Sequence, residues 1–246
     1  MNFNLNAAKA LLGAAVVAGA VTAISQPASA ISFNTSAGTT SSFSGVTTVG
    51  FEGASPAPAN GSSVSANGYT ENGITYTGGA IALGSQPNQF KAPGTDSGTP
   101  DTTNYLTLGG NAGNPVTIVF SKLKGYFGLY LGSIDSYNTI SFFKGASQVG
   151  SFTGTDIATK SVALGGLGLA ALEGNYNKDS YVNFFGDNNS DLFNKVVLTS
   201  SSAAFESDNH AFRTDIPTPA LLPGLIGMGV AAWRKRRGES AEQAEA

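Results

Sequence analysis

The feature that most limits how this chain can fold is a succession of short apolar segments, each bounded by Gly, Asn, Ser or Asp. In the segment 116–120, Val116, Ile118 and Phe120 fall on one face of an extended chain. Because side chains alternate between the two faces of a strand, this period of two predicts a β-strand. About ten short strands separated by turns predict an all-β fold, an antiparallel, jelly-roll-like β-sandwich. We expect these strands at 46–51, 74–76, 105–108, 116–120, 126–131, 139–143, 148–152, 181–185, 195–199 and 205–213.

The stretches between these segments predict loops. Residues 54–67 and 84–103 are rich in Pro, Gly, Ser and Asn, which is typical of surface connections. Residues 31–44 predict either an edge strand or a loose lead-in. Residues 155–175 predict a loop with at most one helical turn, because the glycine-rich run 164–169 disfavours helix.

The composition favours a folded domain and excludes several classes of function. The chain of 246 residues has 15 Phe, 8 Tyr and a net charge of −3, whereas disordered chains are poor in aromatics and highly charged. It has no Cys, which excludes disulfides, thiolate metal sites and Cys nucleophiles. Between Ile31 and Asp215, 13 Asp and Glu stand against 8 Lys and Arg, a net charge of −5. An acidic surface repels phosphate backbones, so nucleic-acid binding is not expected.

The N-terminal end predicts a secretory signal peptide over residues 1–30. Lys9 gives a positive start, and the apolar stretch 10–24 has the length of a signal core rather than of a membrane span. Ala28 and Ala30 are the small residues that signal peptidase requires before its cut. We therefore expect the mature chain to begin at Ile31. The alternative is an uncleaved N-terminal membrane anchor.

The C-terminal end, residues 216–246, predicts a membrane-sorting tail. An apolar run that ends at Trp233 would reach roughly 21 Å as a helix, which is short of a hydrocarbon core of about 30 Å. A basic stop follows it and should stay on the cytoplasmic side of the inner membrane. Such a chain would be held there briefly, with its body outside. The alternative, a buried helix at the end of the domain, is disfavoured by the four consecutive cations of the stop: Arg234, Lys235, Arg236 and Arg237.

This tail resembles the PEP-CTERM sorting signals that exosortases recognise. The matching motif is Pro217, Thr218, Pro219 and Ala220, followed by the apolar run and the basic stop. The common form has Glu where this chain has Thr218, and this chain continues past the stop to Ala246. The resemblance implies export, transient membrane retention, cleavage near the motif by an exosortase-type protease, and delivery to the cell surface or extracellular matrix of a Gram-negative-type cell.

The segments Phe51–Glu52 and 205–212 resemble the recurring first and last strands of domains found upstream of such tails. The resemblance implies a lectin-like or carbohydrate-binding jelly roll.

Residue patterns favour a protein without catalytic activity. His210 is the only histidine, and no Gly-x-Ser-x-Gly elbow accompanies it, so a hydrolytic triad is not supported and His210 is interpreted as a surface or packing residue. A glycosidase requires only two suitably spaced carboxylates. The alternative of a secreted carbohydrate-active enzyme therefore stays open, with candidates Glu52, Glu173, Glu206 and Asp208.

Two tyrosines suggest a glycan-stacking platform. In the expected strand 126–131, Tyr126 and Tyr130 share one face with Gly128 between them. A flat aromatic surface of this kind can stack on a sugar ring, and extracellular polysaccharide is the expected ligand. The alternative is that this face is buried and that the tyrosines bridge core and solvent.

A structural calcium ion is the last expectation. Glu206 and Asp208 are two residues apart, so on a strand both carboxylates point to one face and repel each other. Calcium favours six to eight oxygen ligands and would neutralise them. If the first and last strands lie side by side, as the resemblance implies, Glu52 joins the site, and Asn209 adds an amide oxygen if the strand bends. The alternative is an exposed acidic turn without an ion.

Together these observations predict a signal peptide (1–30), a β-sandwich surface domain (31–215) and a C-terminal sorting signal with a short hydrophobic helix (216–246). The expected function is that of a non-catalytic exported surface or matrix protein.

Overall fold

The computed structural model describes residues 31–36, 38–94, 99–132, 135–163, 180–186, 188 and 191–214, with backbone only for 160–163. The signal peptide with Ala28 and Ala30, the sorting motif 217–220, the basic stop 234–237 and Glu173 lie outside these residues. Within the described part of the chain, no helix combines the length and apolar character needed to cross a membrane.

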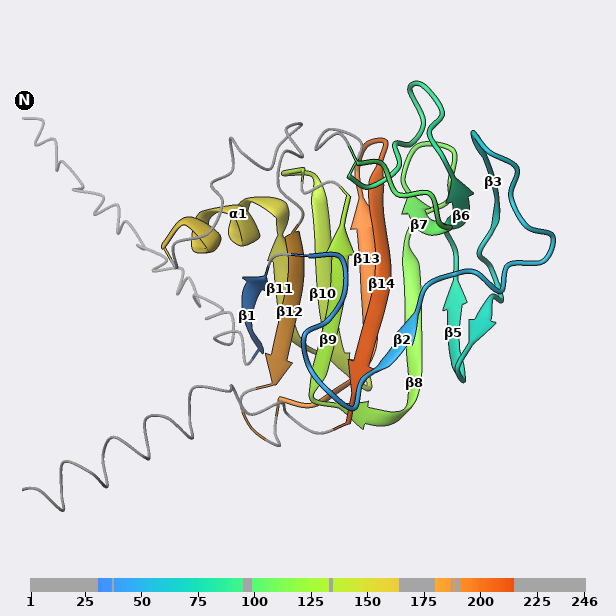
Figure 1. Ribbon diagram of the computed structural model, residues 1–246. Coiled ribbons are helices and arrows are strands. Elements are labelled where there is room, and N and C mark those ends of the chain that lie inside the picture. The colour runs from blue at the N-terminus through green and yellow to red at the C-terminus, as the bar shows by residue number, and fades with distance from the viewer. Residues whose placement is uncertain are drawn as a thin grey trace, which may run out of the picture.

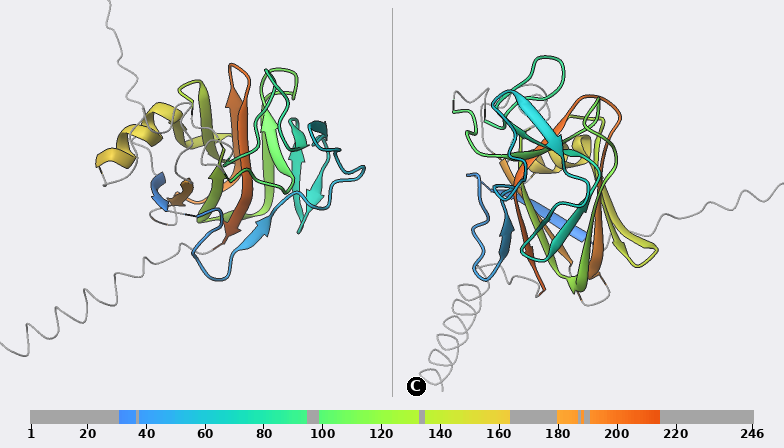
Figure 2. Two further views of the ribbon diagram at one scale, coloured as in Figure 1. Left: turned by 45° about the horizontal axis from the view of Figure 1, so that its top comes forward. Right: turned by 90° about the vertical axis from the view of Figure 1, so that its right-hand side faces the viewer.

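The described chain forms two antiparallel sheets packed face to face, which confirms the all-β sandwich (Figure 1). Sheet A follows the order β1 (Ile31–Ser36), β12 (Ser180–Gly186), β9 (Tyr126–Leu131), β14 (Phe205–Arg213), β7 (Tyr105–Leu108), β6 (Ala80–Leu83) and β3 (Ser62–Ser65), and β2 (Thr47–Val49) also pairs with β14. Sheet B follows the order β11 (Ser147–Thr153), β10 (Asn138–Lys144), β13 (Phe193–Ser200), β8 (Val116–Lys124), β5 (Ile74–Thr77) and β4 (Thr70–Glu71). The side view in Figure 2 shows the two layers.

The structure adds elements that the sequence patterns did not indicate. Strand β3 lies within the expected loop 54–67 and carries one apolar residue, Val64. Strand β6 lies just before the expected loop 84–103, and its all-apolar sequence does not alternate. A helix, α1 (Gly154–Ala163), occupies the start of the expected loop 155–175. It begins with a capping box, in which Asp156 N–H donates to Thr153 Oγ1 (3.1 Å) and Thr153 N–H donates to Asp156 Oδ2 (2.9 Å). The expectation of a loop was wrong there because the glycines that prompted it lie after the helix.

The main core lies between the two sheets and is rich in phenylalanine. On β9, Phe127, Leu129 and Leu131 point into it, as the alternation predicted. On β14, Phe205 and Phe212 point into it, and each is 1% exposed. Phe127 packs on Phe212 and Phe142 with ring centroids 5.3 and 6.0 Å apart. Aromatic contacts across the two sheets therefore hold the sandwich together.

His210 lies in this core and is fully buried. Its Nδ1 is 3.1 Å from the Tyr76 hydroxyl and its Nε2 is 3.0 Å from Ser207 Oγ. Burial disfavours the charged imidazolium and lowers the pKa of His210 to about 3. Because no part of the ring reaches solvent, His210 is a packing residue, which was one of the two roles expected from its position.

Strand β14 lies near the middle of sheet A and has two partners on one of its sides. It pairs with β9 on one side, and on the other with β7 through 205–207 and with β2 through 210–212. The register shifts between Asp208 and Ala211, where Asn209 adopts a left-handed backbone with φ 50°. The expected pairing of the first firm strand with the last is confirmed, and the bulge at Asn209 bends the strand at that point.

Candidate functional site

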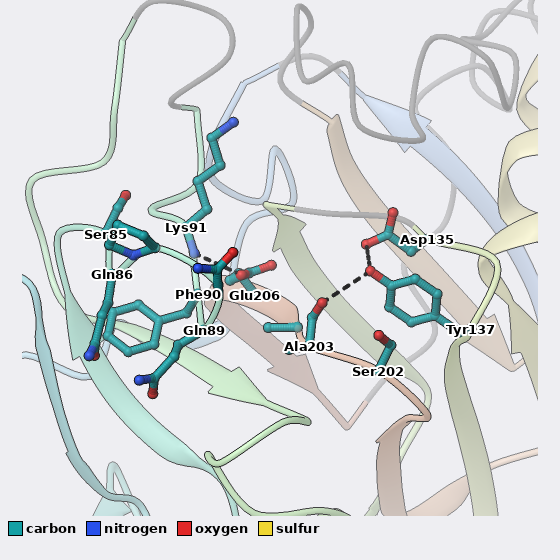
Figure 3. Close-up of a pocket in the computed structure, with 13 residues that line it drawn as sticks. Ser85, Gln86, Gln89, Phe90, Lys91, Asp135, Tyr137, Ser202, Ala203 and Glu206 are labelled. Atoms are coloured by element: carbon teal, nitrogen blue, oxygen red, sulfur yellow. Dashed lines mark hydrogen bonds between the residues drawn. The ribbon is translucent and has the colours of Figure 1, made fainter.

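Three connections meet at one end of the sandwich and border an open hollow of about 850 Å³, which we call the end hollow (Figure 3). They are the segment after β6, the β9–β10 connection and the β13–β14 connection. The side chains that line it come from residues 85–91, Asp135, Tyr137, 202–204 and Glu206. Loops held on a rigid sheet are a frequent location of binding sites.

One wall of the end hollow is a hydrogen-bonded turn that carries amide side chains. Gln86 N–H donates to the carbonyl of Phe90 (2.9 Å), and the N–H groups of Gln89 and Phe90 donate back to the carbonyl of Gln86 (3.1 and 3.2 Å). Asn88 takes the left-handed conformation at the tip, with φ 62°. Phe90 is 6% exposed and packs edge-on against Tyr105 beneath the turn. The turn therefore presents Gln86, Asn88 and Gln89 on a fixed backbone.

The opposite wall carries a half-buried tyrosine. The Tyr137 hydroxyl donates to Asp135 Oδ2 at 2.8 Å and also lies 3.4 Å from the carbonyl oxygen of Ala203 (Figure 3). Tyr137 keeps part of its surface accessible, unlike the core tyrosines. The carboxylate of Asp135 and the carbonyl of Ala203 hold the hydroxyl end of the ring in place, and a fixed ring can act as a stacking surface.

Glu206 lies between the two walls. It is 3% exposed, and its Oε1 accepts the backbone N–H of Lys91 at 2.9 Å. The end hollow thus combines amides, two carboxylates and an aromatic ring. Carboxylates accept, and amides both donate and accept, which matches the hydroxyl groups of a saccharide.

The two tyrosines expected to form a platform do not form one. Tyr126 and Tyr130 share a face, as predicted, but they are 0% and 2% exposed. Together with Tyr181 and Ala211 they form a second cluster on the outer face of sheet A, covered by Phe43, Val46 and Phe185. The expectation is corrected: Phe43 and Val46 of the 38–46 segment pack over this face, beside Phe185 of the neighbouring strand β12. Burying tyrosine rings is favourable when their hydroxyls are bonded, as that of Tyr126 is to Asn183 (2.7 Å).

The four expected calcium ligands lie around the bulge of β14 but have different partners. Glu52 is exposed, and its Oε1 accepts Asn104 N–H at 2.8 Å. The backbone carbonyl oxygen of Asn209 accepts a hydrogen bond from the Tyr181 hydroxyl (2.8 Å). Glu206 accepts the backbone N–H of Lys91. Asp208 is hydrogen-bonded to the carboxyl group of Asp101, which the sequence patterns did not indicate as a site residue. Within the described residues, no group of three or more His, Asp or Glu is arranged to hold a metal ion.

Sequence reasoning also missed Asp135, Tyr137 and the amides of the 86–90 turn. Their signal was weak, because they lie in connections, which have no periodicity. The length of the 84–103 loop is the one feature that could have pointed to the 86–90 turn.

Comparisons with known proteins do not identify the chain: no family model, no curated protein and no solved structure matches it significantly.

Proposed function

We propose that this protein is a non-catalytic, exported surface or extracellular-matrix protein whose jelly-roll-like domain binds a glycan in the end hollow. The observation that carries the proposal is the lining of that hollow, to which the 86–90 turn with its amide side chains, Glu206 and Tyr137 all contribute (Figure 3). A concave site with a few convergent polar groups is the usual form of a small-ligand site.

The charge of the hollow narrows the ligand class. Asp135 and Glu206 contribute two carboxylates, and Lys91 is the one cationic side chain among its described lining residues. An anionic polysaccharide would meet repulsion there, whereas a neutral sugar would meet only hydrogen-bonding groups. We therefore propose a neutral glycan as the ligand.

A glycan array probed with the full chain in detergent tests this proposal. We expect binding to neutral glycans that Tyr137→Ala weakens about tenfold, which corresponds to the loss of about 1.4 kcal/mol of stacking. Tyr137→Phe should retain most of the binding because it keeps the ring. Gln89→Ala should weaken binding, while the matched control Gln148→Ala, on exposed β11, should not. Equal binding by all four variants would place the ligand elsewhere.

The alternative function is that of a secreted carbohydrate-active enzyme. One observation favours it: Asp135 and Glu206 line the same hollow, and a glycosidase requires two carboxylates flanking the bond that it cleaves. Release of reducing sugar from a bound glycan, abolished by Glu206→Gln, would establish this alternative. Binding without release supports the non-catalytic function.

Export and sorting form the second part of the proposal. They rest on the sequence patterns at the two ends, with signal peptidase acting after Ala30, the inner membrane holding the hydrophobic tail transiently, and an exosortase-type protease acting at 217–220. The acidic, cysteine-free domain between them fits an extracellular location without disulfides, since its core is large enough to be stable unaided.

A further inference from the structure

Two carboxylates of β14 contact the long connection between β6 and β7, one at Lys91 and the other at Asp101. Glu206 and Asp208 alternate with core residues and therefore project from the outer face of sheet A. Glu206 Oε1 accepts the N–H of Lys91, and the carboxyl of Asp208 is hydrogen-bonded to that of Asp101. A Cβ at Gly132 would lie 2.8 Å from Pro93 and 3.0 Å from Glu206, so the connection packs tightly on the sheet here.

Among the described residues, the groups that act on Asp208 include no cationic side chain. Asp208 is 1% exposed, and its Oδ1 has no hydrogen-bond partner in this part of the chain. Its other interactions are with the Asn209 backbone N–H, Asp101 and the charge of Glu52. The pKa of Asp208 is raised well above its usual value, mainly by burial and further by Asp101 and Glu52. Tyr76 on β5, Tyr181 on β12 and Tyr130, which lies opposite Asp208 on β9, supply no positive charge.

Two carboxylates in contact require either a shared proton or a cation between them. The groups around Asp208 are held in fixed positions, as a cation site requires. Asp101 is held in place by the N–H of Thr103, which donates to its Oδ1 at 2.8 Å, and by its own N–H, which donates to the Pro93 carbonyl at 2.7 Å. Glu52 is held near the pair by Asn104 N–H. The carboxylates of Asp208 and Asp101 therefore meet, and Glu52 acts on Asp208 through its charge. Asp208 also has a buried oxygen, Oδ1, without a hydrogen-bond partner among the described residues.

We propose that a calcium ion bridges the carboxylates of Asp208 and Asp101, with Glu52 adding its charge, and so fastens residues 99–104 to β14. Calcium suits an all-oxygen site and accepts carbonyl and water oxygens for the rest of its six to eight ligands. Two carboxylates bind it directly, which agrees with the finding that no three His, Asp or Glu among the described residues surround one point. The ligand set differs from the one expected from the sequence, since Asp101 takes the place of Glu206 and Asn209.

Thermal melting of the full chain in detergent at pH 7.5 tests the site, with calcium compared against chelator. At a calcium concentration about 100 times the Kd, we expect the Tm to rise by roughly 5–10 °C. Asp208→Asn and Asp101→Asn should lose this rise. Asp156→Asn, which makes the same charge change on the distant α1, should keep it. In chelator, Asp208→Asn should melt no lower than the wild type, because it removes a buried charge while keeping the side-chain shape.

Calorimetric titration of the full chain should give one calcium ion per chain, and an equal concentration of magnesium should leave the Tm unchanged. A wild-type Tm that is the same in calcium and in chelator would overturn the proposal and assign a shared proton to the pair. A calcium response that survives in both Asp208→Asn and Asp101→Asn would place the ion elsewhere. Either result is separable from the glycan proposal, because neither measurement uses a glycan.

Discussion

Acidification should destabilise this domain through His210, a fully buried imidazole with a pKa near 3. In the unfolded chain this histidine takes up a proton below about pH 6.5, whereas in the folded chain it stays neutral until far lower pH. The unfolded state therefore binds more protons over this window, and the stability contributed by His210 is lost as pH falls. The contribution is fully present above about pH 6.5.

The size of the effect follows from the gap between the two pKa values. Each pH unit below 6.5 costs about 1.4 kcal/mol, so the loss at pH 4.5 is about 2.7 kcal/mol. The loss stops growing near pH 3, where the folded state also binds the proton. A typical domain has 5–15 kcal/mol of stability, so this single residue would consume a substantial part of it.

Urea unfolding at pH 7.5 and pH 4.5, with wild type and His210→Gln compared, isolates this contribution. Glutamine can pair with both Tyr76 and Ser207 but does not titrate. The His210→Gln variant should have a lower free energy of unfolding than the wild type at pH 7.5, because glutamine fills the ring site less well. On going to pH 4.5 the wild type should lose about 2.7 kcal/mol that the variant keeps, so the difference between the two free energies of unfolding should shrink by that amount. If the two stability curves run parallel between these pH values, the buried-imidazole argument is refuted.

The remaining predictions concern packing and export. Gly128→Ala should cost a few kcal/mol in urea unfolding, because its Cβ would lie 2.3 Å from the Tyr126 hydroxyl, whereas Gly50→Ala, whose Cβ would meet only one atom at 3.7 Å, should be nearly neutral. Intact mass of the exported chain should show Ile31 as its first residue, and a species that retains 1–30 would contradict cleavage. Replacing residues 234–237 by neutral residues should weaken membrane retention. Substituting residues 217–220 should leave unprocessed protein in the membrane. Normal surface delivery of both variants would exclude the sorting assignment.

The strands could be predicted where an apolar or aromatic segment lies between turn residues. The bounds of β7, β9 and β14 agree with the sequence expectation for this reason, although β7 and β9 are buried on both faces. Strand β6 was missed because its sequence Ala-Ile-Ala-Leu shows no alternation and contains no aromatic residue. Helix α1 had a local signal, the Thr153–Asp156 capping box, that the neighbouring glycines obscured.

The candidate sites were predictable only in part, because they depend on contacts between distant segments. The sequence indicated that Glu206 and Asp208 share a face and that Glu52 lies near them. It did not indicate that Asp101 is the direct partner of Asp208, because the long connection that carries Asp101 has no periodicity. The burial of Tyr126 was equally hidden, since alternation shows which residues share a face but not what covers that face.

The position of β14 determines when this domain can fold. It is the last described strand in the chain, yet it lies near the middle of sheet A, where it joins β9 to β7 and β2. Until residue 213 has been synthesised, sheet A stays divided and the core lacks Phe205 and Phe212. Sheet A therefore cannot be completed before residue 213 has been made. Under the proposed export, this delay would keep the chain unfolded while it threads through a translocation channel.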